Sequence, residues 1–429
     1  MARRNLKSEI RNLKLTAMTQ GGEAMGRDET GRVIFVPYAI AGETVVVEIV
    51  EAKKNFARAR LREIITPSPA RIAPRCPHFP LPPKRGRARV GDNCGGCQWQ
   101  HIAYPAQLQF KTKIVREQFA RLGKIPDAPV RDAIGMSEPW QYRNNVQFQL
   151  NADGQLCLRA LESHDLVPIR ECHILHPLLD EIFRALDFAY ADFAGVTLRA
   201  GTRTGQKMIV LEGHDDEPPE IEIDEPVSIA YQVPSGETVA LIGQNTLEEK
   251  LGERVFRVSP QSFFQVNTEM AERLIELVAR YLAPRADDVS LDAFGGVGTF
   301  GLTLAPRVAR VIAIEENPRA IEDARANATD LSNAEFFVGA VEKVLPQIDA
   351  RITLAVADPP RAGFAPRALD ALIAHAPHAL AYVSCDPATL ARDARKLVDA
   401  GYRLIETQPV DLFPHTYHIE TVSLFAREK

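Results

Sequence analysis

The hydrophobic pattern changes along the chain, and the first pattern predicts a small all-β unit over residues 10–66. Short strand-like runs are separated there by turn signals such as Gly21-Gly22. Short β-barrels of this size commonly present a basic face to oligonucleotides. The predicted strands are Leu13–Thr19, Val33–Ile40, Thr44–Val50 and Ala57–Ile65, and the basic side chains of the last hairpin are Lys53, Lys54, Arg58, Arg60 and Arg62.

The middle of the chain combines one helix with a second β-rich block. Apolar residues at helical spacing predict a helix over residues 105–122, which Gly123 ends. Residues 126–256 read as β-rich, with a hairpin turn at Asp153-Gly154. The segment 80–90 is basic and rich in proline, which predicts a loop inserted after Cys76.

From about Ser259 the pattern becomes one of alternating helices and strands. A helix begins near Asn267, and apolar strand-like runs then recur between helical segments, which predicts a doubly wound α/β domain. The predicted strands are Val289–Phe294, Val311–Glu315, Glu335–Val338, Leu354–Asp358, Leu380–Cys385, Tyr402–Ile405 and Thr421–Phe425.

A length of 429 residues exceeds one ordinary core and predicts two or three domains. With the patterns above, we expect three, at 1–66, 67–256 and 257–429. We also expect the helix at 105–122 to pack on the last domain. The first residues are polar and no stretch is apolar enough to span a bilayer, so we expect a cytoplasmic, monomeric protein without a membrane partner.

The charge of the chain is distributed unevenly. Residues 1–126 hold 23 Lys and Arg against 10 Asp and Glu, whereas the remainder holds 28 against 46. A basic front end on an acidic protein indicates a module that binds a polyanion such as nucleic acid, although a merely solvated surface is the alternative.

A glycine-rich loop after the first strand of the α/β domain indicates a cofactor site. Residues 296–301 read G-x-G-x-x-G, and Glu315 ends the following strand, where a carboxylate can accept both ribose hydroxyls. This arrangement fits NAD and S-adenosylmethionine equally. Asp358, followed by two prolines, ends a further strand in a stiff turn, as in methyltransferases that hold a planar base.

Cys385 ends an apolar strand and precedes a proline-stopped turn, so its thiol is placed to act on a ligand. A packing role is the alternative. Methylation of a pyrimidine at carbon 5 requires a thiolate that adds to carbon 6 and a base that removes the carbon 5 proton. We expect the N-terminus of the helix 387–398 to lower the thiol pKa. Glu420 is the candidate base, and His415 and His418 are alternatives.

Four of the six cysteines indicate a metal centre. Cys76, Cys94, Cys97 and Cys172 suit either tetrahedral zinc or a 4Fe-4S cluster, and their spacing leaves that choice open. Cys157 lies within a predicted strand and is interpreted as a packing residue.

Together these motifs resemble the S-adenosylmethionine-dependent uracil carbon-5 RNA methyltransferases, in particular the 23S ribosomal RNA branch. The resemblance rests on the cysteine set and on three further segments, which are Phe263-Phe264-Gln265-Val266-Asn267, Ser384-Cys385-Asp386-Pro387 and the segment from His415 to Glu420. It implies a Rossmann-like class I methyltransferase domain, preceded by a TRAM (OB-like) β-barrel and a β-rich iron–sulfur domain. It also implies that Cys385 and Glu420 are catalytic, that Gln265, Phe294, Glu315 and Asp358 bind S-adenosylmethionine or frame the base, and that the four cysteines hold 4Fe-4S.

Three features depart from the family pattern: the gap between Cys76 and Cys94 is long, Gly295 and Thr299 stand where Cys and Asn are frequent, and Ala340 falls where a polar adenine contact is expected. Within the nucleophile motif, Asp386 stands where Asn is commoner. The expected substrate is a uridine in structured RNA, first in 23S ribosomal RNA and otherwise in the T-loop of tRNA. An NAD-dependent oxidoreductase and a non-catalytic zinc protein that binds RNA are the alternatives from other classes.

Overall fold

The computed structural model describes residues 10–80, 94–161, 163–188, 193–221 and 226–427. Its contacts divide the chain into two compact units, each assembled from separate segments. The first comprises Met1–Ile114, Cys157–His173 and Phe413–His418, and the second comprises Val115–Leu156, Ile174–Leu412 and Ile419–Lys429. The predicted segment 80–90 falls almost entirely outside the described residues.

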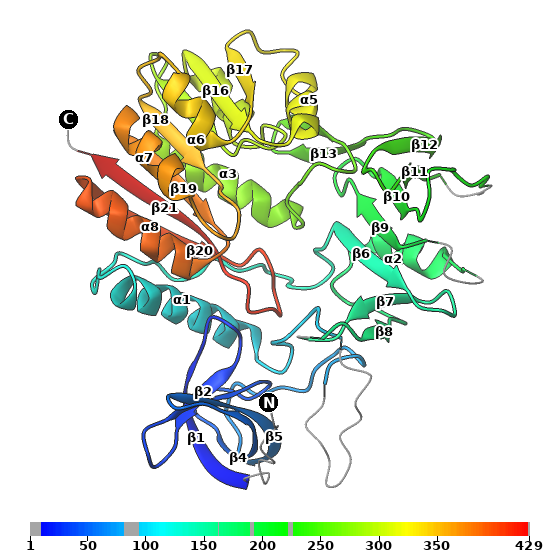
Figure 1. The fold of residues 1–429 in the computed structure, drawn as a ribbon, viewed down its shortest axis with the longest axis vertical. Coiled ribbons are helices and arrows are strands. Elements are labelled where there is room, and N and C mark those ends of the chain that lie inside the picture. Colours follow the sequence, from blue (N-terminus) through cyan, green and yellow to red (C-terminus); the bar gives the residue numbers. More distant parts are fainter. Residues whose placement is uncertain (1–9, 81–93, 162, 189–192, 222–225, 428–429) are drawn as a thin grey trace, which may run out of the picture. The chain divides into compact units, whose positions relative to one another are not determined.

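A closed five-stranded barrel opens the first unit, in the strand order β1-β2-β3-β5-β4 (Figure 1). Side chains alternate between the barrel interior and its surface, as the period of a strand requires, and Leu15, Ile34 and Val47 fill the interior. The predicted barrel is confirmed, with one additional short strand. Its strands are β1 (Ile10–Met18), β2 (Ala24–Arg27), β3 (Val33–Val36), β4 (Thr44–Ala52) and β5 (Phe56–Thr66).

The first unit also contains the β7–β8 hairpin and the beginning of helix α1 (Tyr104–Arg121). Strand β7 (Leu156–Arg159) pairs with β8 (Leu166–Pro168). Cys157 is completely buried in β7, which confirms its interpretation as a packing residue. The last residues of α1 belong to the second unit, where Gly123 lies against the carbonyl of Ala391 in helix α8 (Pro387–Asp399).

The second unit begins with a sheet of short strands in the order β12-β11-β10-β9-β6, followed by the hairpin β13-β14. Helix α2 (Pro177–Ala185) packs on β9. The strands are β6 (Asn145–Leu150), β9 (Gly195–Ala200), β10 (Lys207–Glu212), β11 (Ser228–Gln232), β12 (Thr238–Ile242), β13 (Leu247–Leu251) and β14 (Arg254–Val258).

A seven-stranded α/β sheet forms the rest of the second unit, in the order β17-β16-β15-β18-β19-β21-β20. The first five of these strands run parallel, whereas β21 is antiparallel to both of its neighbours. The alternation predicted from the sequence is therefore confirmed. The strands are β15 (Val289–Ala293), β16 (Arg310–Glu315), β17 (Ala334–Val338), β18 (Leu354–Ala357), β19 (Ala379–Ser384), β20 (Tyr402–Val410) and β21 (Glu420–Arg427).

Helices cover both faces of this sheet, with α7 and α8 on one face and α3 on the other (Figure 1). The strands between them are apolar on both sides, as expected for strands buried under two helical layers. The helices are α3 (Thr268–Leu282), α4 (Gly301–Leu304), α5 (Pro318–Ala326), α6 (Val341–Val344) and α7 (Pro366–His375), with 3-10 turns at Ala305–Arg307 and Leu345–Gln347. Among the described residues, no helix is long and apolar enough to cross a membrane.

Candidate active site

The candidate residues converge at one edge of the α/β sheet because of the strand directions. Parallel strands end at the same edge, so Phe294, Glu315, Asp358 and Cys385, which follow or end β15, β16, β18 and β19, all lie there. The antiparallel strand β21 begins at this edge with Glu420. One antiparallel strand in an otherwise parallel arrangement therefore adds a fifth candidate side chain to the edge.

Cys385 and Glu420 face each other across neighbouring strands. Ser384 pairs with Thr421 in antiparallel register, which sets the following residue, Cys385, opposite the preceding residue, Glu420. The Thr421 hydroxyl donates to the Ser384 carbonyl over 3.1 Å and fixes this register. Glu420 is 4% exposed, and burial together with the nearby Asp358 raises its pKa well above the ordinary value.

The ionisation of Cys385 differs from the sequence-based prediction. We expected helix α8 to lower the thiol pKa, but burial, followed by the charges of Glu420, Asp358 and Asp386, raises it to about 12. Asp386 adds to this rise, after burial, Glu420 and Asp358. Its carboxylate caps α8 by accepting from the Ala388 and Thr389 amides at 2.9 and 3.0 Å, so a negative charge stands at the helix N-terminus beside the thiol.

Replacing Asp386 by Asn tests this electrostatic account. The Asn side chain keeps the helix cap but removes the negative charge, so we expect the pKa of Cys385 to fall by roughly one unit. The pH profile of iodoacetamide modification, followed on the peptide that contains Cys385, would then move to lower pH. Asp399→Asn, at the far end of α8, serves as the matched control and should leave the profile in place. An unmoved profile in Asp386→Asn would show that Asp386 does not control the thiol.

Arg361 is a further charged residue near the thiol, and its role was not predicted from the sequence. It follows Asp358-Pro359-Pro360, and its guanidinium lies 3.8 Å from the Asp386 carboxylate. Arg361 lowers the pKa of Cys385, in the opposite direction to burial and the nearby carboxylates. The signal available in the sequence was its position three residues after the strand-ending Asp358.

The glycine-rich loop is held by two carboxylates. Asp292 is fully buried in β15 and accepts from the Gly301 amide at 2.6 Å, while Glu315 accepts from the Gly296 amide at 3.0 Å. Gly298 has a φ of 92°, which favours glycine there. Burial raises the pKa of Asp292 to about 7, with smaller contributions from Asp358 and Glu315. The edge is therefore rich in carboxylates, which suits a cationic ligand.

Two aromatic residues border this loop. Phe294 adopts a left-handed φ of 67° directly after β15, and its ring meets that of Phe364 edge to face, with 5.3 Å between the ring centroids. A bulky residue in this conformation is unusual and indicates a local constraint at a functional turn. Phe294 is half-buried, so part of its ring remains accessible at the sheet edge.

Gln265 joins the same group from the loop before α3. Its side-chain amide donates to Asp358 at 3.3 Å, and its carbonyl accepts from the Asn144 side chain at 3.0 Å. Phe263, two residues earlier, is 68% exposed, whereas the intervening Phe264 is buried. An exposed Phe beside a polar site is a candidate surface on which a planar base can stack. The sequence motif contains two adjacent Phe residues and did not show which of them is exposed.

Comparisons with known proteins agree with this geometry. Residues 7–61 match the TRAM domain model, and residues 238–344 and 345–428 match the model described as tRNA (Uracil-5-)-methyltransferase. A protein described as an uncharacterized RNA methyltransferase from Gloeobacter violaceus is 35% identical over 98% of this chain and 97% of its own length. A protein with the same description from Caldanaerobacter subterraneus is 33% identical over 96% of this chain and 97% of its own.

The chain belongs to the family of S-adenosylmethionine-dependent RNA uracil-5 methyltransferases. A solved structure extends the likeness to the whole architecture: the Pyrococcus abyssi tRNA (uracil-54, C5)-methyltransferase in complex with S-adenosyl-L-homocysteine. It superimposes with a TM-score of 0.74 at 25% identity and covers 97% of this chain and 100% of its own. The methyltransferase assignment therefore replaces the NAD-dependent alternative for the glycine-rich loop.

The predicted 4Fe-4S centre of this methyltransferase is not supported. Within the described ranges, no three His, Cys, Asp or Glu side chains come together as a metal site. The four cysteines nevertheless lie near one another in the first unit. Burial raises the pKa of Cys97, and the thiols of Cys172, Cys94 and Cys76 raise it further. The thiols thus lie close enough to act on one another electrostatically, although no three described ligands are gathered as a metal site.

The alternative bases, His415 and His418, belong to the first unit. His415 is buried, and its Nδ1 lies 3.2 Å from the Gln107 side-chain nitrogen. The ring of His418 contacts those of Phe413 and Tyr417. Local hydrogen bonding and ring packing account for both imidazoles.

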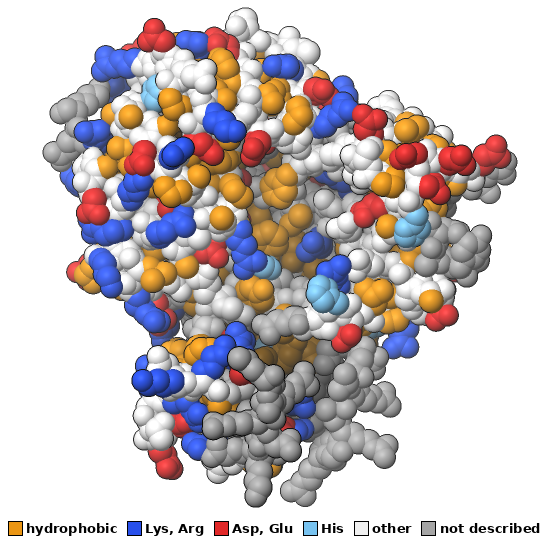
Figure 2. Space-filling model, in the orientation of Figure 1, with side chains coloured by type: hydrophobic (Ala, Val, Ile, Leu, Met, Phe, Trp, Pro, Cys, Tyr) orange, Lys and Arg blue, Asp and Glu red, His pale blue; other side chains and the backbone are white. Residues whose placement is uncertain are grey.

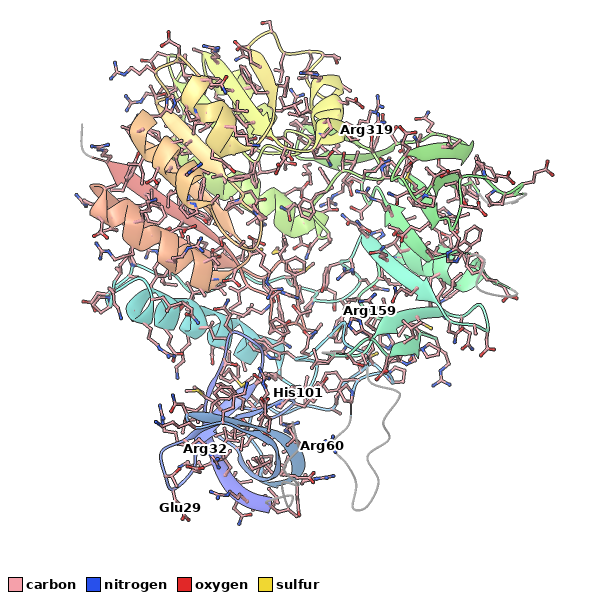
Figure 3. All side chains as sticks on the ribbon, in the orientation of Figure 1. Glu29, Arg32, Arg60, His101, Arg159 and Arg319 are labelled. Carbon is pink, nitrogen blue, oxygen red and sulfur yellow. The ribbon has the colours of Figure 1, made fainter. Side chains whose placement is uncertain are left out.

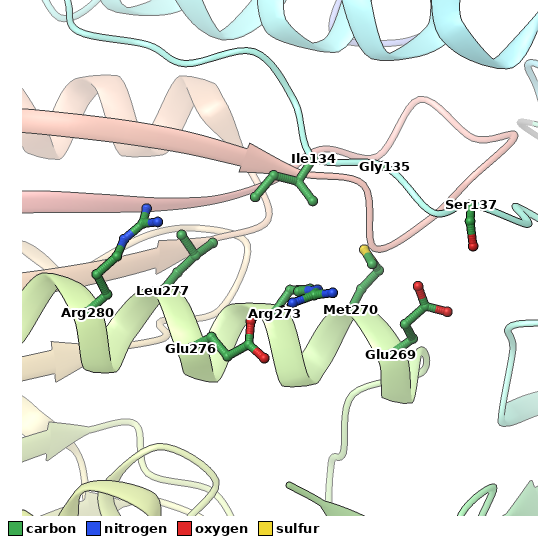
Figure 4. A pocket seen from close by; sticks show the side chains of 9 residues that line it. All are labelled: Ile134, Gly135, Ser137, Glu269, Met270, Arg273, Glu276, Leu277 and Arg280. Atoms are coloured by element: carbon green, nitrogen blue, oxygen red, sulfur yellow. Dashed lines mark hydrogen bonds and ion pairs between the residues drawn. The ribbon is translucent and has the colours of Figure 1, made fainter.

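A groove of about 530 Å³ runs along α3 beside Ile134 and Gly135 (Figure 4). Its floor is apolar and its rim carries charges of both signs, including Arg273 paired with Glu276 at 2.8 Å. Cys385, Glu420 and Asp358 are not among its lining residues. The groove is therefore separate from the candidate active site.

Proposed function

We propose that this methyltransferase transfers a methyl group to carbon 5 of a uridine in structured RNA, with Cys385 as nucleophile and Glu420 as general base. The observation that carries the proposal is the strand register that sets these two side chains opposite each other, beside Asp358. S-adenosylmethionine, when bound, supplies the methyl group on a positively charged sulfur. The carboxylates of this edge complement such a charge.

The residues divide the reaction between them. The Cys385 thiol gives its proton to water, and the resulting thiolate adds to carbon 6 of the uracil, which makes carbon 5 nucleophilic. After methylation, Glu420 takes the proton from carbon 5, and the thiolate leaves carbon 6 as the ring double bond re-forms. Gln265 and Asp358 hold the base or the cofactor beside these groups, while Phe294 and Glu315 frame the cofactor loop. The target base must leave its stack to reach Cys385.

Exposed basic side chains of the barrel support an RNA substrate, although several other basic side chains there form ion pairs. Several of its arginines are paired with carboxylates, including Arg58 with Glu23 at 2.9 Å and Arg62 with Glu48. Arg60 remains exposed on the barrel surface (Figure 3). Over α7 and α8 of the second unit, lysines and arginines alternate with acidic residues (Figure 2), and Lys396, for example, is paired with Asp370 at 2.6 Å.

The proposed target is 23S ribosomal RNA, and the tRNA T-loop is the second candidate. The sequence resemblance, including the cysteine set, supports the first, whereas the tRNA enzyme of Pyrococcus abyssi supports the second. Ribosomal RNA and tRNA from cells that lack this protein would each be incubated with it and with methyl-labelled S-adenosylmethionine. We expect 5-methyluridine in the ribosomal RNA. Label in tRNA alone would replace the first target by the second, and label in another nucleoside would contradict the proposed reaction.

We also propose that Cys76, Cys94, Cys97 and Cys172 hold an iron–sulfur cluster. The electrostatic effect of Cys172, Cys94 and Cys76 on Cys97 supports a shared site, because it requires the four sulfur atoms to lie close together, and thiolates are the ligands of such clusters. Two hydrogen bonds of His78 support it further. The carbonyl of His78 accepts from the Cys94 amide. Its ring accepts from the amide of Arg170, two residues before Cys172. When bound, the cluster would supply a structural crosslink between these loops.

Metal analysis of anaerobically purified protein tests this assignment. We expect about four iron atoms and matching labile sulfide per chain, because a 4Fe-4S cluster contains both. Cys97→Ser should lose them, whereas Cys157→Ser, a change at the packing cysteine, should retain them. Zinc without iron or sulfide would overturn the iron–sulfur assignment, and full iron content in Cys97→Ser would overturn the ligand set.

A further inference from the structure

The loop between β14 and α3 carries two candidate site residues, Phe263 and Gln265. Residues 259–266 of this loop form neither a strand nor a helix. Loops of this kind adopt several conformations unless other groups hold their main chain. Substrate-positioning side chains must nevertheless be held to within a fraction of an ångström. Two charged residues from distant parts of the second unit hold this loop.

Arg199 in β9 binds the loop through its carbonyls. The side chain is only 4% exposed, and its guanidinium donates to the carbonyls of Ser259, Pro260 and Ser262 at 2.8, 3.0 and 3.2 Å. The planar guanidinium spreads its donors over three nitrogens in a fixed geometry, whereas a lysine ammonium carries its three donors on a single nitrogen that rotates. Burial lowers the pKa of Arg199 to about 10, so the guanidinium still carries its charge at neutral pH.

Asp323 in α5 binds the donors of the same loop. Its carboxylate is 1% exposed and accepts from the amide and hydroxyl of Ser259 and from the hydroxyl of Ser262, each at 2.7 Å. Asp323 also acts electrostatically on Arg199. Each buried charge is thus hydrogen-bonded and balanced by the other, which is the condition for keeping such charges inside a protein.

Hydrogen bonds from Asn144 also hold the end of this loop, at Gln265 and Val266. The Asn144 amide donates to the carbonyl of Val266, and the Asn144 side chain donates to the carbonyl of Gln265. Asn144 accepts in turn from the amide of Ala200, the residue after Arg199. The β9 strand therefore supports both the start and the end of the loop.

We propose that Arg199 and Asp323 are positioning residues that hold the loop 259–266, so that Phe263 and Gln265 are aligned before substrate binds. The inference rests on the proposed function for the roles of Phe263 and Gln265, but the ordering of the loop itself does not depend on it. Neither charged residue needs to contact RNA or cofactor. Loss of either charge releases the loop while Cys385 and Glu420 stay in their strands.

Arg199→Lys tests the proposal with the buried charge retained. We expect hydrogen exchange of the amides in residues 259–266 to rise at least about tenfold, because fewer carbonyls are held, and kcat/KM for RNA to fall by about tenfold or more. Arg257→Lys is the matched control: this arginine lies 3.7 Å from Asp323 but is half exposed and binds no loop carbonyl among the hydrogen bonds found. It should change neither quantity.

A double-mutant cycle separates positioning from a general loss of stability. In a Phe263→Ala/Gln265→Ala background, Arg199→Lys should cause little further loss of kcat/KM, since the residues through which it acts are already absent. An equal loss in both backgrounds, or unchanged exchange of the loop in Arg199→Lys, would overturn the proposal. Hydrogen exchange is measured without turnover, so this test holds even if the proposed reaction is wrong. An incorrect reaction would show itself separately, because the wild-type protein would then form no 5-methyluridine.

Discussion

Cys385→Ala is expected to abolish methyl transfer while binding of S-adenosylmethionine persists. The thiolate is the group that adds to carbon 6, and no other thiol was found at this edge of the sheet among the described residues. Without that addition, carbon 5 of uracil remains a poor nucleophile. Activity should therefore fall by about 10⁴-fold or more, as for loss of an essential nucleophile. Methyl incorporation and calorimetric cofactor binding measure the two effects separately.

The control for this variant is Cys157→Ala. Cys157 is also a cysteine at a strand position, but it is completely buried in the β7–β8 hairpin of the first unit. Its replacement should lower stability by removing core volume and leave kcat almost unchanged, provided that the protein is assayed below its unfolding temperature. Turnover of Cys385→Ala near the wild-type rate would refute the nucleophile assignment, and loss of cofactor binding would point to a structural role instead.

Glu420→Gln is expected to trap the covalent adduct between protein and RNA. The amide occupies the same space but cannot take the proton from carbon 5, so the reaction stops after methylation. Removal of this carboxylate also removes a charge that raises the pKa of Cys385, which favours thiolate formation and addition. A slowly migrating protein–RNA band should therefore accumulate on a denaturing gel while product release falls by about 10²-fold or more.

Glu406→Gln provides the comparison. Glu406 lies in the neighbouring strand β20 but accepts from Arg131 and Tyr281, away from the thiol. This variant should release product at the normal rate and accumulate no adduct. If Glu420→Gln turns over normally, or stops without any adduct, then another group removes the proton.

The sequence was sufficient to predict the α/β domain and the meeting of its strand ends. Parallel strands that each end in a polar residue bring Glu315, Asp358 and Cys385 to one edge by geometry alone. The boundaries were less accurate where polar residues continue a strand. Strand β20 extends to Val410 rather than Ile405 because buried polar groups pair across the sheet, as when Thr407 and Ser423 join their hydroxyls at 2.9 Å.

Electrostatic effects in the site depended on distances that the sequence does not contain. The helix after Cys385 was visible in the pattern, but the direction of the pKa shift follows from burial and three carboxylates, one of them the helix cap itself. The supporting role of Arg199 was equally hidden, since its partners lie about 60 residues further along the chain. The barrel was predictable from its strands, whereas the pairing of its arginines was not.

The measurement that tests the central claim most directly uses RNA in which 5-fluorouridine replaces uridine. Fluorine at carbon 5 leaves no proton for Glu420 to remove, so a thiol that adds to carbon 6 stays attached after methylation. Wild-type protein, RNA and S-adenosylmethionine should give a stable complex whose digestion places the nucleotide on Cys385. Attachment at another residue, or no attachment by a preparation that forms 5-methyluridine in ordinary RNA, would contradict the account.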